Sequence, residues 1–198
     1  YIPNRFTHGY GASLKLIKEL IQEKPDLIIM LDCGSNSHEA INYLNKNKIK
    51  TLIIDHHEIN KPYPRVNSLI NPKKECDYNE YDYLSAATLS YFFLDSIIKK
   101  KKLQVSFDTN LIYVLLSVIC DVMPLRKINR IIAINVLKNF FIKKNFMINK
   151  IFKLNKIKRP FDINDLGFLI GPILNSAGRL DDPNKVVDLL CSKNDLVK

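Results

Sequence analysis

Two short runs of consecutive apolar residues stand out in the first third of the chain, and each ends in an acidic residue. They are residues 26–32 (DLIIMLD) and 50–55 (KTLIID). Runs of this length are typical of strands buried on both faces. Between them, Gly34 turns the chain, and Asn36 and Glu39 have the spacing of a capping box that opens a helix over about 37–45. A strand, a helix and a strand in about thirty residues predict a βαβ unit and a parallel sheet.

The rest of the chain has mostly helical periodicity. A short third strand is predicted at 66–70, and residues 1–11 and 61–83 are predicted as mainly loop. Helices are predicted at 13–23 with Ser13 as N-cap, 84–100, 107–120, 128–143, the first part of 146–161, and 185–192 with Asp182 or Asn184 as cap. The pattern therefore predicts an α/β fold, a parallel β-sheet flanked by helices, followed by a mainly helical segment. A boundary is expected near Arg159-Pro160, only as a subdomain hinge, and it would divide the chain into 1–160 and 161–198.

Metal-binding residue types follow both predicted strands. Asp32 ends the first, and Asp55, His56 and His57 end the second. Parallel strands bring their carboxyl ends to one edge of a sheet, where ligands bind in open α/β folds. Carboxylate and imidazole together favour Mn²⁺, Fe²⁺ or Zn²⁺, and carboxylate alone favours Mg²⁺. Asp32, His56 and Asp121 can supply three ligands to one ion. His57 can instead face a substrate phosphate, with Asp55 orienting an imidazole through its free N–H.

Asp121 is the most informative of these residues. It follows ten apolar or small residues, LIYVLLSVIC, where an unpaired charge is costly unless it meets a cation. Each residue also has a plainer interpretation. Asp32 can cap the turn that follows it, Asp121 can be a surface acid in a loop, and the two histidines can be one packed and one exposed imidazole.

A second candidate site is Gly178-Arg179. The guanidinium suits phosphate oxygens, and glycine permits close approach of a backbone. The plainer interpretation is a surface arginine in a turn. The net charge of +10, from 30 basic and 20 acidic residues, favours a nucleic-acid partner, although a Lys-, Asn- and Ile-rich proteome gives the same total.

The cysteines and the apolar runs indicate the cellular compartment. The four cysteines form no CxxC pair, and their apolar neighbourhoods suit reduced thiols in a cytoplasmic protein. The longest apolar run, residues 111–120, is too short to span a bilayer, so no membrane association is expected.

Six segments occur in an order and spacing that resemble the RecJ family of single-strand-specific 5′→3′ DNA exonucleases, within the DHH phosphoesterase superfamily. They are YIPNRFTHGYG, LIIMLDCGSNSHEAI, LIIDHHE, SLINPKK, LSVICDVMPL and GPILNSAGRLDDP. The resemblance implies a two-metal hydrolase of single-stranded DNA that acts in DNA repair and recombination, with Mn²⁺ or Mg²⁺ as cofactor. It implies that Asp32 bridges two ions, that His56 and Asp121 bind metal, and that His57 contacts the scissile phosphate with the help of Asp55. Arg179, with Gly178 and Asn175, is then substrate-binding.

The resemblance also has departures. The family's first acidic motif, Asp-x-Asp-Gly, falls upstream of Tyr1, and its C-terminal DHHA1-type domain falls beyond the segment 161–198, so the fragment is expected to be inactive on its own. The chain has Pro172-Ile173-Leu174-Asn175 where the family commonly has Pro-Arg-Leu-Asn. Two alternatives stay open: a DHH oligoribonuclease or cyclic-dinucleotide phosphodiesterase, and a non-catalytic nucleic-acid-binding relative.

Overall fold

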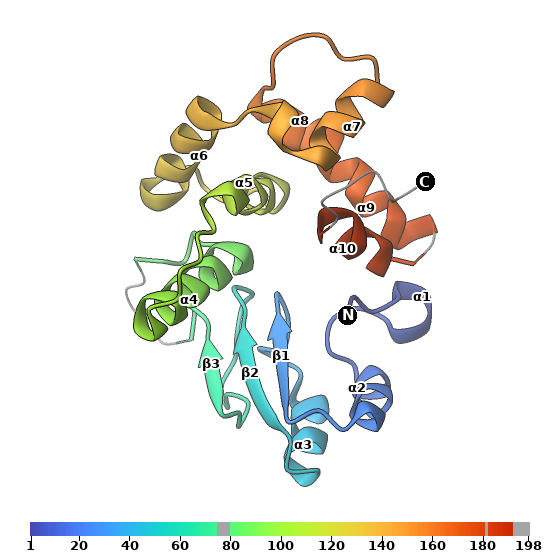
Figure 1. Cartoon of the computed structure of the whole chain (residues 1–198). Helices are drawn as coiled ribbons and strands as arrows, with labels where there is room; N and C mark the ends of the chain where they lie inside the picture. The colour runs from blue at the N-terminus through green and yellow to red at the C-terminus, as the bar shows by residue number, and fades with distance from the viewer. Residues whose placement is uncertain (75–79, 181, 192–198) are drawn as a thin grey trace.

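Three parallel strands form the sheet that positions the candidate site. A computed structural model describes residues 1–74, 80–180 and 182–191 of the chain. The strands are β1 (Leu27–Leu31), β2 (Lys50–Ile54) and β3 (Ser68–Ile70), in the order β1-β2-β3. Leu31 pairs with Ile54, and Ile54 pairs with Ile70, so all three strands end at one edge. The predicted α/β fold with a parallel sheet flanked by helices is confirmed (Figure 1).

The N-terminal helices, apart from the first one, pack against one face of this sheet. They are α1 (Arg5–His8), α2 (Leu14–Leu20), the short 3-10 helix η1 (Ile21–Glu23) and α3 (His38–Lys46). Ser13 caps α2 as predicted, with its side chain accepting a hydrogen bond from the Leu16 backbone N–H. Ile17 of α2 and Leu44 of α3 pack with Met30 and Ile53 in a buried cluster. These contacts hold the two site-bearing strands together.

The prediction that the first strand is buried on both faces was wrong. Leu27, Ile29 and Leu31 expose about half of their surface, at 47%, 48% and 54%. On β2, by contrast, Leu52 and Ile54, which pair with Ile29 and Leu31, are buried. Because β1 lies at the edge of the sheet, side chains on one of its faces are less covered by neighbouring elements than the β2 side chains beside them.

The capping box predicted from Asn36 and Glu39 was also wrong. Ser37 is the N-cap of α3, and it makes no side-chain capping bond. The Asn36 amide instead donates to the Glu58 carbonyl at 2.7 Å, and its oxygen accepts from the Asn60 N–H at 3.4 Å. Asn36 therefore ties the start of α3 to the segment that follows β2, close to the histidine pair.

The remaining helices form the half of the molecule toward which the strands point (Figure 1). They are α4 (Ala86–Lys101), η2 (Asp108–Asn110), α5 (Leu111–Cys120), α6 (Lys127–Asn139), η3 (Ile142–Lys144), α7 (Phe146–Leu154), α8 (Ile163–Asp165), the π-helical turn η4 (Leu166–Ile170), α9 (Gly171–Leu180) and α10 (Asn184–Cys191). The mainly helical second segment is therefore present. No described helix combines the length and apolar character needed to cross a membrane.

A second core joins these helices. Ile112 and Leu115 of α5, Ile148 of α7, and Leu166 and Ile170 of η4 are buried together in it. Residues on both sides of position 160 thus share one core, and the division at 160 stays a prediction. Gly178 and Arg179 lie within α9, not in a turn.

The N-terminal segment contacts the last helices. The Ile2 N–H donates to the Asn184 side-chain oxygen at 2.8 Å, and an Arg5 nitrogen donates to the Asn175 Oδ1 at 3.3 Å. Asp182 accepts a hydrogen bond from the Asn184 N–H at the start of α10, which agrees with one of the two predicted caps. The predicted end of this helix, residue 192, lies outside the described residues. These contacts join the two ends of the chain, near the residues predicted to bind substrate.

Candidate metal centre

Asp32 stands directly after β1, in a backbone conformation that turns it away from the strand. Its φ is +60°, in the left-handed region that aspartate tolerates better than most residues. Its N–H still donates to the Ile54 carbonyl at 2.9 Å, which fixes the residue to the end of β2. Gly34 then takes φ +108°, so the chain can reverse toward α3. This local geometry brings the Asp32 carboxylate to the edge of the sheet.

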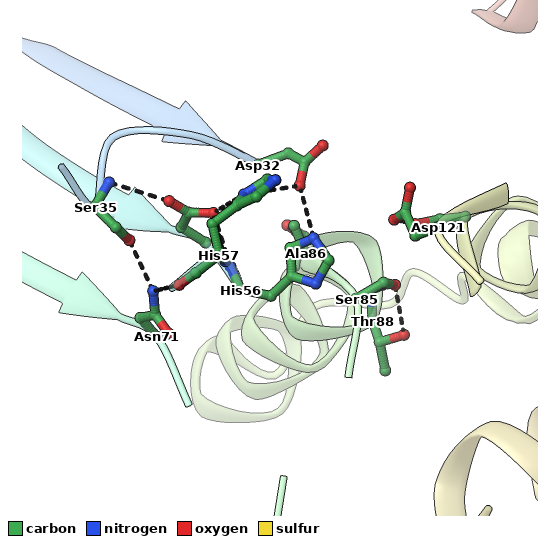
Figure 2. Close-up of polar contacts among 12 residues, drawn as sticks. Asp32, Ser35, His56, His57, Asn71, Ser85, Ala86, Thr88 and Asp121 are labelled. Atoms are coloured by element: carbon green, nitrogen blue, oxygen red, sulfur yellow. Dashed lines mark hydrogen bonds and ion pairs between the residues drawn. The ribbon is translucent and has the colours of Figure 1, made fainter. Parts of the chain in front are cut away.

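His56 and His57 follow β2 and meet Asp32 at this edge. The His56 Nε2 lies 3.2 Å from the Asp32 Oδ1, and the His57 Nδ1 lies 3.9 Å from the same oxygen. One ligand atom from each of the three residues falls within 4.8 Å of the other two (Figure 2). His56 is 9% exposed, whereas Asp32 is exposed. The cluster is therefore open on the carboxylate side and closed behind the imidazole.

The donor set fits a divalent transition metal. Ligand atoms bonded at about 2.1 Å to one ion lie about 3 Å apart at neighbouring positions, close to the Asp32–His56 separation. The buried Nδ1 of His56 has no hydrogen-bond partner among the described residues, so the polar contact of this imidazole is the one that Nε2 makes with Asp32. Hydrogen bonding to Asp32 raises the pKa of His56, even though burial opposes that shift. Aspartate and histidine together are the ligands expected for Mn²⁺, Fe²⁺ or Zn²⁺.

Asp55 holds His57 in one orientation. The Asp55 Oδ1 lies 2.8 Å from the His57 Nδ1 and accepts from the backbone N–H groups of His56 and His57 at 2.8 and 3.2 Å. Its Oδ2 accepts from the Ser35 N–H at 3.0 Å. Burial alone would raise the pKa of this carboxyl, but hydrogen bonds from Ser35 and His57 outweigh burial and lower it to about 2. With Nδ1 engaged by a carboxylate, Nε2 is the His57 nitrogen left to meet a ligand.

Ser35 and Asn71 belong to this network, although sequence reasoning assigned neither a role. The Asn71 amide donates to the Ser35 Oγ at 2.7 Å and to the His57 carbonyl at 2.9 Å (Figure 2). Its oxygen accepts from the Lys73 N–H at 2.8 Å. Asn71 directly follows β3, so the third strand also ends in a polar residue at the carboxyl edge. The position of Asn71 directly after the predicted third strand was a signal from which its role could have been predicted.

Asp121 faces the cluster from the end of α5. Figure 2 shows its carboxylate across from Asp32 and His56, although it lies outside the group of mutually close ligand atoms. The Ser117 hydroxyl donates to it at 3.1 Å. Burial and then the charge of Asp32 raise the pKa of Asp121, while the nearby imidazoles lower it. The charge of Asp32 beside Asp121 makes this a negative centre that a cation would relieve.

The three residues predicted to bind substrate share one face of α9. Asn175, Gly178 and Arg179 are spaced three and four positions apart, the spacing of neighbours on a helix surface. Asn175 and Arg179 are exposed, and a Cβ added at Gly178 would meet only Pro183, at 3.7 Å. Arg5 brings a second guanidinium to this face through its bond to Asn175. The face therefore offers two donor forks and an amide to an anionic ligand.

In a comparison with protein-family models, residues 1–119 match the model of the DHH family, N-terminal domain. Among curated proteins, the chain is 31% identical to the single-stranded-DNA-specific exonuclease RecJ of Haemophilus influenzae, over 96% of this chain and 35% of that protein. It is 28% identical to the Escherichia coli protein of the same name, over 98% of this chain and 36% of that one. The chain thus spans about a third of the length of these relatives.

Solved structures share the fold. A crystal structure of exonuclease RecJ bound to manganese matches 96% of this chain and 48% of its own chain, with a TM-score of 0.80 and 23% identity. The structure of RecJ in complex with Mn²⁺ from Thermus thermophilus matches 91% of this chain and 27% of its own, with a TM-score of 0.77 and 21% identity. At these identities the likeness concerns the fold.

Proposed function

Because the chain belongs to the DHH family, we propose that it is the DHH domain of a RecJ-like, metal-dependent exonuclease of single-stranded DNA. The observation that carries the proposal is the cluster of Asp32, His56 and His57 at the carboxyl edge of a parallel sheet. The curated relatives are named as single-stranded-DNA-specific exonucleases, and two of the structural neighbours contain manganese. The activity would serve DNA repair and recombination.

Three residues of this chain would hold metal. Asp32 presents an exposed carboxylate to the cluster, and His56 offers a buried imidazole whose Nε2 meets the Asp32 carboxylate. Asp121 adds a carboxylate from α5 on the opposite side (Figure 2). The ions would be Mn²⁺ or Mg²⁺, two of them in the full-length protein. The chemistry that bound ions supply is activation of a water nucleophile and neutralisation of charge on phosphate oxygens.

The protein groups around this centre would position the substrate. Asp55 keeps the His57 Nδ1 engaged, so Nε2 can donate a hydrogen bond to a phosphate oxygen. Because its hydrogen bonds lower the pKa of Asp55, this carboxylate stays ionised near neutral pH and remains an acceptor for that ring nitrogen. Arg179 and Asn175 would hold a phosphate on the exposed face of α9, and Gly178 would let a backbone approach between them.

Hydrolysis assays with the full-length protein test this function. Labelled single-stranded DNA, blunt duplex DNA and a linear dinucleotide are offered with Mn²⁺ or with EDTA. The proposal predicts Mn²⁺-dependent release of mononucleotides from the single strand and little attack on the duplex. Preference for the dinucleotide would instead support the oligonucleotide-hydrolase alternative. Strand binding without hydrolysis of any substrate would support a non-catalytic relative.

Histidine variants link that activity to the cluster. His56→Ala should abolish Mn²⁺-dependent hydrolysis, because it removes the buried metal-binding imidazole. His38→Ala is the matched control, since His38 lies in the first turn of α3 and outside the cluster. Hydrolysis near the wild-type rate in His56→Ala would contradict the ligand assignment.

A further inference from the structure

The positive charge of the chain is concentrated in one segment. Residues 122–161 carry 11 of the 30 Lys and Arg residues and none of the 20 Asp and Glu residues. An even spread over the chain would put about six basic and about four acidic residues there. The other 158 residues carry one more acid than base. A proteome rich in lysine would raise the basic content everywhere, so the concentration belongs to this segment.

The segment forms α6, η3, α7 and the connection to α8. Figure 1 shows α5 between the sheet and α6. The apolar residues Ile132 and Val136 of α6 and Ile148 and Ile151 of α7 are buried in the second core. The basic helical surface is the set of exposed lysines that these elements turn outward: Lys138, Lys143, Lys144, Lys153, Lys156 and Lys158.

The lysines of this surface differ in their pairing from the other cations of the segment. Other cations of the segment are paired: Arg126 with Asp82, and Arg159 with Asp165. Within the described parts of the chain, no ion pair engages any lysine of the basic helical surface. Unpaired like charges on neighbouring elements repel one another, and an external anion with several charges would relieve that repulsion.

Exposed apolar groups lie among the lysines. The Phe141 ring is 62% exposed, and the Lys144 amine lies 5.2 Å from its centroid. A ring beside an amine suits a nucleic acid, whose bases stack on aromatic rings while its phosphates meet the cations. The positive charge comes from lysines, which act as point charges and do not read base edges in the bidentate way that arginine does. The chemistry therefore favours contact with a backbone regardless of sequence.

We propose that the basic helical surface binds the phosphate backbone of a nucleic-acid single strand outside the metal centre. The inference rests on the proposed function, because a strand whose end is hydrolysed at the sheet edge has further phosphates to place. The helical half toward which the strands point carries this surface (Figure 1). The surface would hold a long substrate while its end is being cleaved, and it would contribute nothing to a dinucleotide.

Two triple variants of the full-length protein separate this role from net charge. The test variant is Lys138→Gln, Lys143→Gln and Lys153→Gln. The matched control is Lys46→Gln, Lys100→Gln and Lys101→Gln. All six are exposed lysines in the last turn of a helix or 3-10 helix, and both variants lose three charges. Fluorescence anisotropy measures the binding of labelled dT25 between 0.05 and 1 M salt, with EDTA present.

In the test variant, the slope of log K against log salt concentration should become less steep by about 2, because each single-strand phosphate contact contributes about 0.7 to the slope. If the wild type and the test variant bind dT25 equally near 1 M salt, their binding constants then differ about 100-fold at 0.1 M salt. The control should follow the wild-type line. Equal slopes for the two variants would overturn the proposal. Wild-type binding to phosphatidylserine vesicles that the test variant loses, with its dT25 binding unchanged, would assign the surface to a membrane.

Mn²⁺-dependent assays of the same proteins distinguish the two proposals. If the wild-type protein binds dT25 through the test lysines but hydrolyses no substrate, the proposed function is wrong and the binding surface is still supported. If the test variant hydrolyses and binds dT25 like the wild type, the proposed binding surface is wrong and the proposed function is still supported. If both proposals hold, the KM for dT25 rises in the test variant while its kcat stays near the wild-type value.

Discussion

Replacing Asp55 by asparagine tests the network that supports His57. Asparagine has nearly the same shape, but it has no charge and one oxygen fewer. One of its side-chain positions becomes an NH₂ group, which cannot accept. If that group faces Ser35, the Ser35 N–H loses the acceptor it now has at 3.0 Å. The three hydrogen bonds at the other oxygen become neutral ones, which are weaker.

The pKa of Asp55 sets the size of the expected effect. A fall from 3.8 to about 2 favours the ionised form by roughly 2 kcal/mol in the folded protein. Because this figure already includes the hydrogen bond from the Ser35 N–H, Asp55→Asn should lose roughly 2 kcal/mol of unfolding free energy at pH 7. A loss of this size is a large share of the stability of a single domain.

The loss should depend on pH in a defined direction. The folded-state pKa of Asp55 is lowered, so its charge contributes stability above the unfolded pKa of about 4. That contribution disappears as the pH falls through the folded pKa of about 2. The difference between wild type and Asp55→Asn should therefore be constant from pH 7 to about pH 5 and should shrink by roughly 2 kcal/mol toward pH 2.

Urea unfolding followed by circular dichroism, with EDTA present, measures this difference in the metal-free protein. Asp26→Asn is the control, because Asp26 is exposed, and it should change stability by less than about 0.5 kcal/mol. An Asp55→Asn variant as stable as the control, or one whose deficit is the same at pH 7 and pH 2.5, would refute the reasoning.

Other predictions concern the neighbouring residues. Asn71→Ala should reduce kcat for hydrolysis, with Mn²⁺ affinity kept within about threefold as measured by calorimetry, because Asn71 holds the His57 carbonyl and contacts no ligand atom of the cluster. Gly34→Ala should destabilise the fold by about 1–3 kcal/mol in urea, since a Cβ would lie 2.9 Å from the Met30 sulfur at a φ of +108°. Gly178→Ala, which is free of such strain, should keep or raise stability; equal losses at both glycines would contradict the packing argument. Arg179→Ala should weaken binding of single-stranded DNA and reduce its salt slope by about 0.7, with Mn²⁺ affinity unchanged, and an unaltered slope would mark Arg179 as an ordinary surface residue.

The sheet and the tips of its strands could be predicted from local signals. Continuous apolar runs ending in Asp32 and in the Asp55–His57 triplet predict parallel strands with polar ends at one edge, and the register of β1 and β2 confirms that arrangement. The exposure of Ile29 could not be predicted in this way, since burial depends on which helices cover a strand. Asn36 shows the same limit, because its side chain binds a carbonyl 22 positions away instead of capping its own helix.

The polar network behind the site needed the three-dimensional structure. Ser35 and Asn71 lie 36 positions apart, and only the pairing of β2 with β3 brings them within 2.7 Å. The charge of residues 122–161 was readable in the sequence, but the burial of the apolar faces of α6 and α7 decides which way their lysines point. In both cases a local pattern names the residue types, and tertiary packing decides what they meet.

The position of a bound manganese ion would show which residues form the metal site. Crystals of the full-length protein grown with Mn²⁺ would give an anomalous difference map at the manganese absorption edge. We expect a peak within bonding distance of an Asp32 carboxylate oxygen and a His56 ring nitrogen, with the Asp121 carboxylate on the same ion. A peak that contacts neither Asp32 nor His56, with the carboxyl edge of the sheet empty, would contradict this expectation.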